Sequence, residues 1–299
     1  MAQEIDYVVP MVFPEDSRWQ RDLDRRRMYH ESGTLSERYR SWGTEELLVD
    51  CVRRNMPWVR NIIILLARDS QRQEWMNDYE TLTDQPKLRI VYHREFIPSE
   101  LLPTFNSATI EMFLHKISGL SDCFLYGNDD MFPLGALQET DFFRDGLPCQ
   151  HHEVQDYPKD VNMFHMSCMA GLNFVGEEFG MQYSTTWLRG GHSIAPIMKS
   201  TCEHLWKRGA KRIMLSCTPT RRAFNFYQYI YSYWQHLSGQ YVDHVPERAY
   251  VSTKNTTGEV RDAIRTCNGI LCINDNECVE DIDAYATVVK EEIRKRLWG

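Results

Sequence analysis

The chain has 299 residues, of which 42% are hydrophobic and 25% are charged. This composition is typical of a globular protein and excludes a disordered or fibrous chain. The 34 basic and 42 acidic residues give a net charge of -8, which argues against a broad nucleic-acid-binding surface. The nine cysteines contain no Cys-x-x-Cys pair, so we expect reduced, mostly buried thiols instead of a disulfide framework or a zinc ribbon.

The first half of the chain alternates short apolar runs with helical periodicity, which predicts β-α-β units. Strands are expected at residues 5–9, 61–66, 88–92, 123–126 and 270–273. Helices are expected after Thr44, from about Ser107 with Asn106 as its N-cap, and at 197–208, 225–237 and 282–297. The stretch 146–192 is irregular in pattern, and we expect a helical insertion in that half of the chain.

The sequence has no segment suited to crossing a membrane. Its longest aliphatic run, 62–67, has six residues, far short of the roughly 20 that a span needs. The N-terminus reads MAQEIDYVV, which lacks the basic start and long apolar run of a signal peptide. We therefore expect a cytoplasmic protein.

Two acidic-amide clusters follow expected strands. Asn128, Asp129 and Asp130 come after the strand 123–126, and Asn274 and Asp275 come after 270–273. The carboxyl ends of parallel strands are where ligands bind, and loop carboxylates there can hold Mg²⁺ or Mn²⁺ while a diphosphate supplies further oxygens. The alternative for each cluster is a solvated turn that ends a strand.

Two further segments contain candidate catalytic groups. His192 follows two glycines and precedes Pro196, so it is a candidate general base near pH 7; the alternative is an incidental loop histidine. Arg221 and Arg222 precede an expected helix, where their guanidinium groups can fork around a phosphate. The alternative for this pair is two solvated arginines.

Four separated sequence blocks resemble those of a known family in their order and in their residue motifs. They extend from residue 5 to about 276, and the most specific phrases are Pro57-Trp58-Val59-Arg60, Leu102-Pro103-Thr104-Phe105-Asn106-Ser107, Asn128-Asp129-Asp130-Met131-Phe132 and Cys272-Ile273-Asn274-Asp275. These blocks resemble the Stealth family of sugar-phosphate transferases, which includes bacterial capsular polysaccharide phosphotransferases and the lysosomal-targeting N-acetylglucosamine-1-phosphotransferase. The family usually has Trp-Val-Asp-Gly where this chain reads Met11-Val12-Phe13-Pro14, so any nucleotide contact of a carboxylate at position 13 is either lost or supplied by Glu15 or Asp16.

The resemblance implies both a fold and a reaction. The expected fold class is α/β, with a Rossmann-like (glycosyltransferase-A-like), mostly parallel sheet flanked by helices and a helical insertion. Residues 1–299 would form one catalytic domain, in which 1–145 bind the nucleotide sugar and 146–299 complete the active site. The implied reaction is transfer of a sugar-1-phosphate from a nucleotide diphosphate sugar to an acceptor hydroxyl, which forms a phosphodiester and releases a nucleoside monophosphate.

The resemblance also implies a role for each site residue. The expected acceptor is a saccharide or a lipid-linked saccharide in capsule or cell-surface polysaccharide synthesis, and attachment at the inner membrane face would be peripheral. The catalytic residues are His192, Arg222 and Asp130; the substrate-binding residues are Arg38, Arg40, Asn106, Ser107, Glu111 and Arg221; and the ligands of Mg²⁺ or Mn²⁺ are Asp129, Asp130, Asn274 and Asp275.

Two alternatives remain open at this point. A metal-dependent glycosyltransferase would use the same donor, but the acceptor would attack the anomeric carbon and release nucleoside diphosphate. An inactive sugar-nucleotide-binding protein would have lost the reaction, and the missing carboxylate at position 13 favours this reading.

Overall fold

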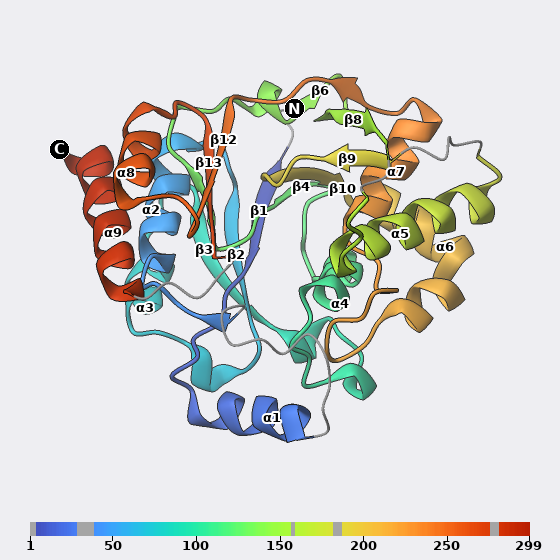
Figure 1. The fold of residues 1–299 in the computed structure, drawn as a ribbon, viewed down its shortest axis with the longest axis horizontal. Helices are drawn as coiled ribbons and strands as arrows, with labels where there is room; N and C mark the ends of the chain where they lie inside the picture. Colours follow the sequence, from blue (N-terminus) through green and yellow to red (C-terminus); the bar gives the residue numbers. More distant parts are fainter. Residues whose placement is uncertain (1–3, 29–38, 157–158, 182–186, 276–280) are drawn as a thin grey trace.

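The computed structural model describes residues 4–28, 39–156, 159–181, 187–275 and 281–299. A central sheet crosses the molecule, and helices cover it on both sides (Figure 1). The strands are β1 (Ile5–Pro10), β2 (Asn61–Leu66), β3 (Lys87–Tyr92), β4 (Cys123–Tyr126), β5 (Met131–Pro133), β6 (Phe143–Arg144), β7 (Leu147–Gln150), β8 (His152–Gln155), β9 (Trp187–Gly190), β10 (Ala195–Met198), β11 (Val242–Asp243), β12 (Arg248–Ser252) and β13 (Ile270–Asn274). The α-helices are α1 (Ser17–Met28), α2 (Glu45–Asn55), α3 (Trp75–Glu80), α4 (Ser107–Met112), α5 (Met163–Phe179), α6 (Lys199–Ser216), α7 (Tyr229–Ser238), α8 (Thr257–Thr266) and α9 (Ile282–Trp298).

The central sheet has the strand order β10-β4-β1-β2-β3. Strands β1 to β4 run parallel, and β10 is antiparallel to β4. A smaller sheet has the order β12-β13-β5, in which β13 is parallel to β12 and antiparallel to β5. The predicted mostly parallel α/β sheet is therefore confirmed. Its parallel strands end at one common edge, because parallel neighbours share a direction.

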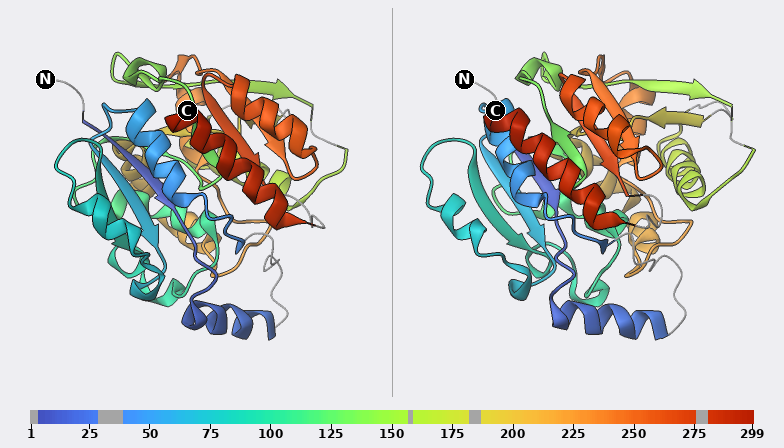
Figure 2. Two further views of the ribbon diagram at one scale, coloured as in Figure 1. Left: turned by 90° about the vertical axis from the view of Figure 1, so that its left-hand side faces the viewer. Right: turned by 60° about the vertical axis from the view of Figure 1, so that its left-hand side comes forward.

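The apolar runs form the strands because both faces of the sheet are covered. Five of the six residues of β2 are buried, as continuous apolar runs in parallel sheets usually are. One face packs against α2, and α9 lies beside α2 and α8 (Figure 2). The other face meets a second core built from α4, α6 and α7 with the insertion helix α5. All eight cysteines of the described residues are free and buried, as predicted.

The predicted strands are confirmed, whereas several helix predictions need correction. Residues 195–198 form β10, so the helix predicted from 197 begins at Lys199 because β10 completes the sheet beside β4. The helix predicted from 225 begins at Tyr229, since Asn225 is used in side-chain hydrogen bonds of the preceding loop. The helix from Ser107 ends at Met112 and continues only as a short 3-10 turn at Leu114–Lys116.

The N-caps of the helices agree only in part with those predicted from the sequence. Asn106 is the N-cap of α4, and its side chain accepts a hydrogen bond from the N–H of Ala108, as expected. Thr44 precedes α2 as predicted, yet its side chain makes no capping hydrogen bond. Within the described part of the chain, no helix has the length and apolar character needed to cross a membrane.

Candidate active site

The acidic loop 127–130 connects the two sheets, because β4 ends at Tyr126 and β5 begins at Met131. The pairing of β10 with β4 sets Ala195 opposite Tyr126, which brings the preceding His192 to this loop. The pairing of β13 with β5 sets Cys272 opposite Met131. Two independent strand pairings therefore bring distant polar residues to the carboxyl end of β4.

Asp130 is the centre of the resulting cluster. Its Oδ2 lies 3.4 Å from Nε2 of His192 and accepts hydrogen bonds from Nδ2 of Asn274 at 3.0 Å and from Sγ of Cys272 at 3.6 Å. Nε2 of His192 also lies 3.4 Å from Nδ2 of Asn274. We call Asp130, His192, Cys272 and Asn274 the Asp130 cluster. The structure thus brings together three residues predicted for the site and adds Cys272.

One oxygen of this cluster lacks a partner. Among the described residues, Oδ1 of Asp130 is buried without a hydrogen-bond partner, and so is the buried hydroxyl of Tyr7 on β1. A side chain at Gly127 would place its Cβ only 2.2 Å from this hydroxyl, so glycine is required where the loop passes Tyr7. A buried carboxylate oxygen without a donor is costly, and a bound cation would satisfy it.

Asp129 is surrounded by other acidic side chains. Burial raises its pKa to about 8, and the negative charges of Asp130 and Glu45 add to the effect. Asp129 is not part of the compact donor group of Asp130, His192 and Cys272 found among the described residues. Its predicted role as a metal ligand stays a prediction.

The charge of His192 is controlled by its acidic neighbours. Burial alone would lower the pKa of His192, but the charge of Asp130, its hydrogen bond and the more distant charge of Glu111 outweigh burial and raise that pKa. The imidazole side chain remains 34% exposed. Tyr250 lies edge-on to it, with 6.4 Å between the ring centroids. His192 is therefore held by a carboxylate while one side stays open to a substrate.

Asp275 follows Asn274 but has different partners. Its carboxylate accepts hydrogen bonds from Nε of Arg40 at 2.8 Å, Nη2 of Arg40 at 2.5 Å and the indole of Trp42 at 3.2 Å. The sequence assigned Asp275 to the metal and Arg40 to the substrate. In the structure these two residues neutralise each other, because the segment before α2 runs past the end of β13.

A second polar network surrounds Glu111 on α4. Its carboxylate accepts from the backbone N–H of Gln228 at 2.7 Å and from the hydroxyl of Tyr126 at 3.2 Å. Burial raises the pKa of Glu111 to about 7, although the hydrogen bond from Gln228 and the charge of Arg221 act in the opposite direction. Because Tyr126 ends β4, this network directly adjoins the Asp130 cluster.

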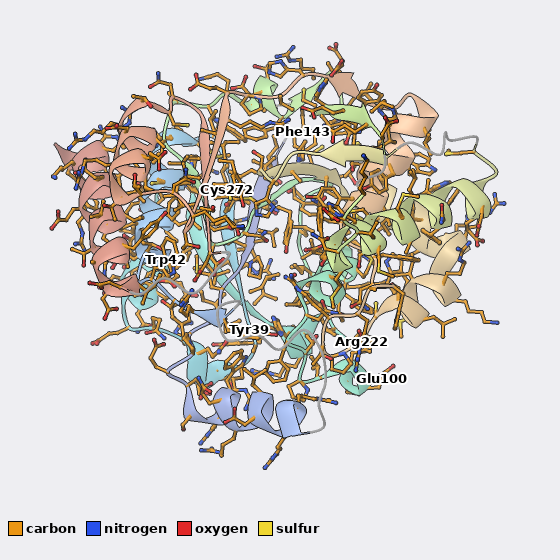
Figure 3. The ribbon with its side chains drawn as sticks, viewed as in Figure 1. Tyr39, Trp42, Glu100, Phe143, Arg222 and Cys272 are labelled. Atoms are coloured by element: carbon orange, nitrogen blue, oxygen red, sulfur yellow. The ribbon has the colours of Figure 1, made fainter. Side chains whose placement is uncertain are left out.

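The two adjacent arginines have different surroundings. Nη2 of Arg221 donates to Oγ of Ser107 at 2.7 Å, and the charge of Arg221 acts on both Glu111 and His192. Arg222 lies apart from Cys272 in Figure 3. The structure therefore places Arg221 nearer to the cluster, whereas the catalytic role predicted for Arg222 stays a prediction.

Asn106 supports the loop that carries these arginines. It is fully buried, and its Nδ2 donates to the carbonyl of Thr218 and to Oδ1 of Asn225, both at 3.0 Å. These contacts hold the loop 218–220 against α4. The structure thus shows Asn106 in a supporting position, and its predicted contact with substrate stays a prediction. Arg38 lies outside the described residues.

Two cavities are lined by described residues of the sheet edge and its loops. The larger, about 400 Å³, lies at the carboxyl ends of β2 and β3 and is lined by residues that include Arg18, Arg68, Arg94, Ser70 and Thr104. Two of its arginines are paired, Arg68 with Asp22 and Arg94 with Asp69. Asp16, one of the carboxylates expected to replace position 13, accepts a hydrogen bond from Ser70 at 2.7 Å and so adjoins this cavity.

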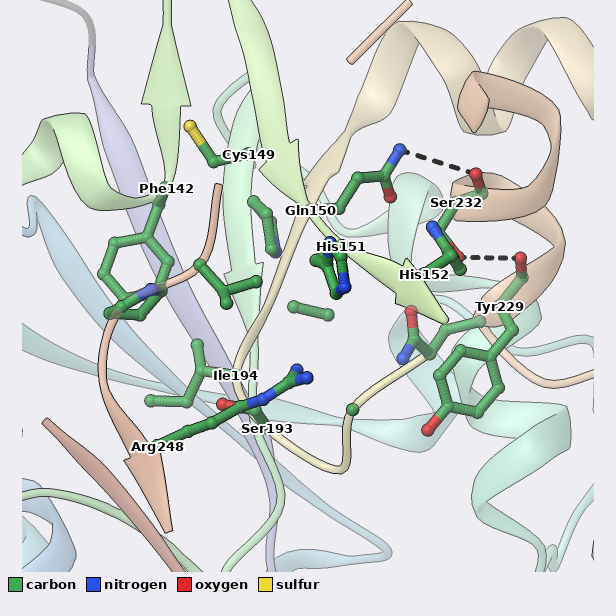
Figure 4. A pocket seen from close by; sticks show the side chains of 16 residues that line it. Phe142, Cys149, Gln150, His151, His152, Ser193, Ile194, Tyr229, Ser232 and Arg248 are labelled. Carbon is green, nitrogen blue, oxygen red and sulfur yellow. Dashed lines mark hydrogen bonds between the residues drawn. The ribbon is translucent and has the colours of Figure 1, made fainter. Parts of the chain in front are cut away.

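The smaller cavity, about 60 Å³, lies against the loop that carries His192. Gly191, Ser193 and Ile194 form one wall, and Figure 4 shows Tyr229, Gln150 and Arg248 around it. A side chain at Gly191 would meet the guanidinium group of Arg248 at 1.8 Å, so this glycine permits the arginine to cross the loop. The lining combines hydrogen-bonding groups with the aromatic rings of Phe142 and Tyr229.

Sequence reasoning missed two members of this site. Cys272 was read as one of several buried thiols and Tyr7 as a residue of a buried strand. The feature that identifies them is strand pairing. Tyr7 lies on β1, which pairs with β4, and Cys272 lies on β13, which pairs with β5; β4 and β5 flank the acidic loop. Local sequence does not give the pairing of β13 with β5, so this signal could not be used without the fold.

The fold and the site define an α/β protein with a histidine–carboxylate centre at the carboxyl edge of a mostly parallel sheet. Residues 38–150 match the model of Stealth protein CR2, conserved region 2. The receptor polysaccharide phosphotransferase WefC of Streptococcus gordonii is 29% identical over 96% of this chain and 95% of its own length. The capsular polysaccharide phosphotransferase WcwK of Streptococcus pneumoniae is 28% identical over 97% and 95%, respectively. The chain is therefore similar to Stealth proteins over residues 38–150 and to bacterial polysaccharide phosphotransferases over most of its length.

Among solved structures, the galactosyltransferase LgtC in complex with donor and acceptor sugar analogs matches 97% of this chain and 95% of its own, with a TM-score of 0.46 and 11% identity. The glycosyltransferase GlyE of Streptococcus pneumoniae has a TM-score of 0.42 and 13% identity, over 99% of this chain and 64% of its own.

Proposed function

We propose that this protein transfers a sugar-1-phosphate from a nucleotide diphosphate sugar to an acceptor hydroxyl in the synthesis of a capsular or cell-surface polysaccharide. The reaction forms a phosphodiester and releases a nucleoside monophosphate. The observation that carries the proposal is the contact of His192 with Asp130 at the carboxyl end of β4. Relatives named as polysaccharide phosphotransferases match nearly the full length of the chain, which supports this reaction class.

The larger cavity is the proposed site of the nucleotide. Neighbouring strands lie about 4.8 Å apart, and β1 separates β2 from β4. The ends of β2 and β4 are therefore about 10 Å apart, a separation that a diphosphate can bridge. The arginines that line the cavity at β2 and β3 supply positive charge for the phosphate groups.

Asp130 is the proposed ligand of Mg²⁺ or Mn²⁺ on the diphosphate. Its buried, unpartnered Oδ1 fits such a cation, because these ions bind through one or two carboxylates and substrate oxygens. The bound ion would neutralise charge on the phosphates. The thiol of Cys272 suits neither ion.

His192 is the proposed general base. In its neutral form the Nε2–H of His192 faces Asp130, so the free Nδ1 takes the proton of the acceptor hydroxyl as the oxygen attacks phosphorus, and Asp130 stabilises the imidazolium that forms. Arg221 is the proposed partner of the transferred phosphate, since its charge already acts on His192 and Glu111. The acceptor saccharide is proposed to approach through the smaller cavity, whose wall includes Tyr229 and the loop of His192. The location of the protein in the cell stays a prediction.

The released nucleotide tests the proposal directly. We would incubate the purified protein with a panel of nucleotide diphosphate sugars and a saccharide acceptor, and we expect nucleoside monophosphate in step with phosphodiester product. His192→Ala should slow release by about 10²- to 10⁴-fold while the melting temperature stays close to that of the unmodified protein. Stoichiometric nucleoside diphosphate would instead identify a glycosyltransferase and overturn the proposal.

A further inference from the structure

The Asp130 cluster contains a sulfur atom that the proposed reaction does not use. Cys272 is fully buried on β13, and its thiol points at the carboxylate of Asp130. One nitrogen, one oxygen and one sulfur donor, from His192, Asp130 and Cys272, lie within 4.8 Å of one another. This is the compact donor group found among the described residues, and its composition is that of sites for borderline or soft metals.

The spacing of the donor atoms matches a tetrahedral ion. With metal bonds of about 2.0 Å to oxygen or nitrogen and about 2.3 Å to sulfur, tetrahedral geometry separates oxygen from nitrogen by about 3.3 Å and oxygen from sulfur by about 3.5 Å. The observed separations from Oδ2 of Asp130 are 3.4 Å to Nε2 of His192 and 3.6 Å to Sγ of Cys272. Little movement of these side chains is needed to bind such an ion.

The donors are fixed on one side and accessible on the other. The pairing of β13 with β5 fixes Cys272 opposite Met131. The side chains of His192 and Asp130 are 34% and 21% exposed, which leaves a path for an ion from solvent. Three protein donors leave the fourth tetrahedral position to water or substrate, as in catalytic zinc sites.

We propose that Asp130, His192 and Cys272 form a binding site for a thiophilic divalent cation of the Zn²⁺ class, in competition with the Mg²⁺ or Mn²⁺ of the proposed reaction. On binding, the S–H bond of Cys272 breaks, a bond from sulfur to the metal forms, and the proton passes to solvent. The competition between Zn²⁺ and Mg²⁺ or Mn²⁺ rests on the proposed function. The binding site itself does not, because its three donor groups are present whatever reaction the protein catalyses. Zn²⁺ at this position would bind both His192, the proposed base, and Asp130, the proposed ligand of the cation on the diphosphate. It would therefore stop turnover.

Cobalt is the probe for this site, because Co²⁺ replaces Zn²⁺ and gives a thiolate-to-cobalt charge-transfer band. We expect the purified protein to bind one Co²⁺ with this band, and one equivalent of Zn²⁺ to abolish it. Cys272→Ser should remove the band and weaken Zn²⁺ binding at least 100-fold. Cys217→Ser is the matched control: Cys217 is also buried, and its thiol donates to the carbonyl of Ile213 at 3.2 Å, as a serine hydroxyl can. This variant should keep the band.

His192→Ala provides a second variant if Cys272→Ser does not fold. It should keep a cobalt–thiolate band of altered position and weaken Zn²⁺ binding at least tenfold. A wild-type protein without the band, or an unchanged band in Cys272→Ser, would overturn the proposal. These measurements contain no nucleotide sugar, so a failure of the proposed reaction would appear separately, as absent monophosphate release with the band intact.

Discussion

Two acidic-amide segments of this protein look alike in sequence and differ in the structure. Asp130 and Asp275 both come shortly after a buried strand and an asparagine. Asp275 is paired with Arg40 at 2.5 Å, whereas Asp130 has a buried oxygen without any partner. Asp275 is neutralised by a guanidinium group that is always charged, whereas Asp130 faces only the imidazole of His192, so Asp130 is the better candidate for a ligand.

The largest effect is expected at Asp130. Asp130→Asn keeps the shape of the side chain but removes its charge, so the proposed cation and the imidazolium of His192 both lose their partner. We expect monophosphate release to fall by about 10³-fold, measured at saturating donor. A rate within tenfold of the unmodified protein would show that the unpartnered oxygen has no part in the reaction.

The two arginines offer the next comparison. Arg221 donates to Ser107 and lies in the electrostatic field of His192, so Arg221→Ala should lower kcat by about 10²-fold through loss of one phosphate contact. Arg222→Ala is the matched control and should change kcat less than tenfold. The reverse order of these two effects would restore the catalytic role that the sequence assigned to Arg222.

Glu111 should make the stability of the protein dependent on pH. Its pKa in the folded state is about 7, above the ordinary value of a glutamate, so the fold favours the protonated form. This stabilisation is present below pH 4.5 and is lost as pH rises through 7. From pH 5 to pH 8, the free energy of unfolding is expected to fall by roughly 2–3 kcal/mol through this group.

Glu111→Gln cannot titrate and should remove this loss. The measurement is the free energy of unfolding in urea at pH 5 and pH 8 for both proteins. Equal pH dependence in the variant and the unmodified protein would show that Glu111 is already ionised at pH 5 in the folded state.

The smallest effect is expected at Asp275. Asp275→Asn loses the ion pair with Arg40 but keeps an oxygen that can accept from Trp42, so we expect a loss of about 1 kcal/mol in stability. Monophosphate release should fall less than fivefold. A loss as large as that of Asp130→Asn would make the two segments equivalent and would return Asp275 to the metal site.

The sequence by itself located the four parallel strands of the central sheet and β13, but not the other strands. The apolar runs at 61–66 and 123–126 form β2 and β4 as predicted, because burial on both faces of a sheet selects continuous apolar residues. The helical spacing of apolar residues predicted the helix at 282–297, which is α9. The polar residues after β4 and β13 marked where these strands end. These signals are local, so one sequence suffices to find them.

The tertiary structure alone decided which polar groups meet. Cys272 and Asp130 are 142 residues apart, and only the pairing of β13 with β5 joins them. Asp275 is neutralised by a residue 235 positions away, and Arg221 donates to a residue 114 positions away. Such contacts depend on register and on the path of the chain, which short-range propensities do not contain, and for that reason the reactive carboxylate could not be told from the paired one before the fold was known.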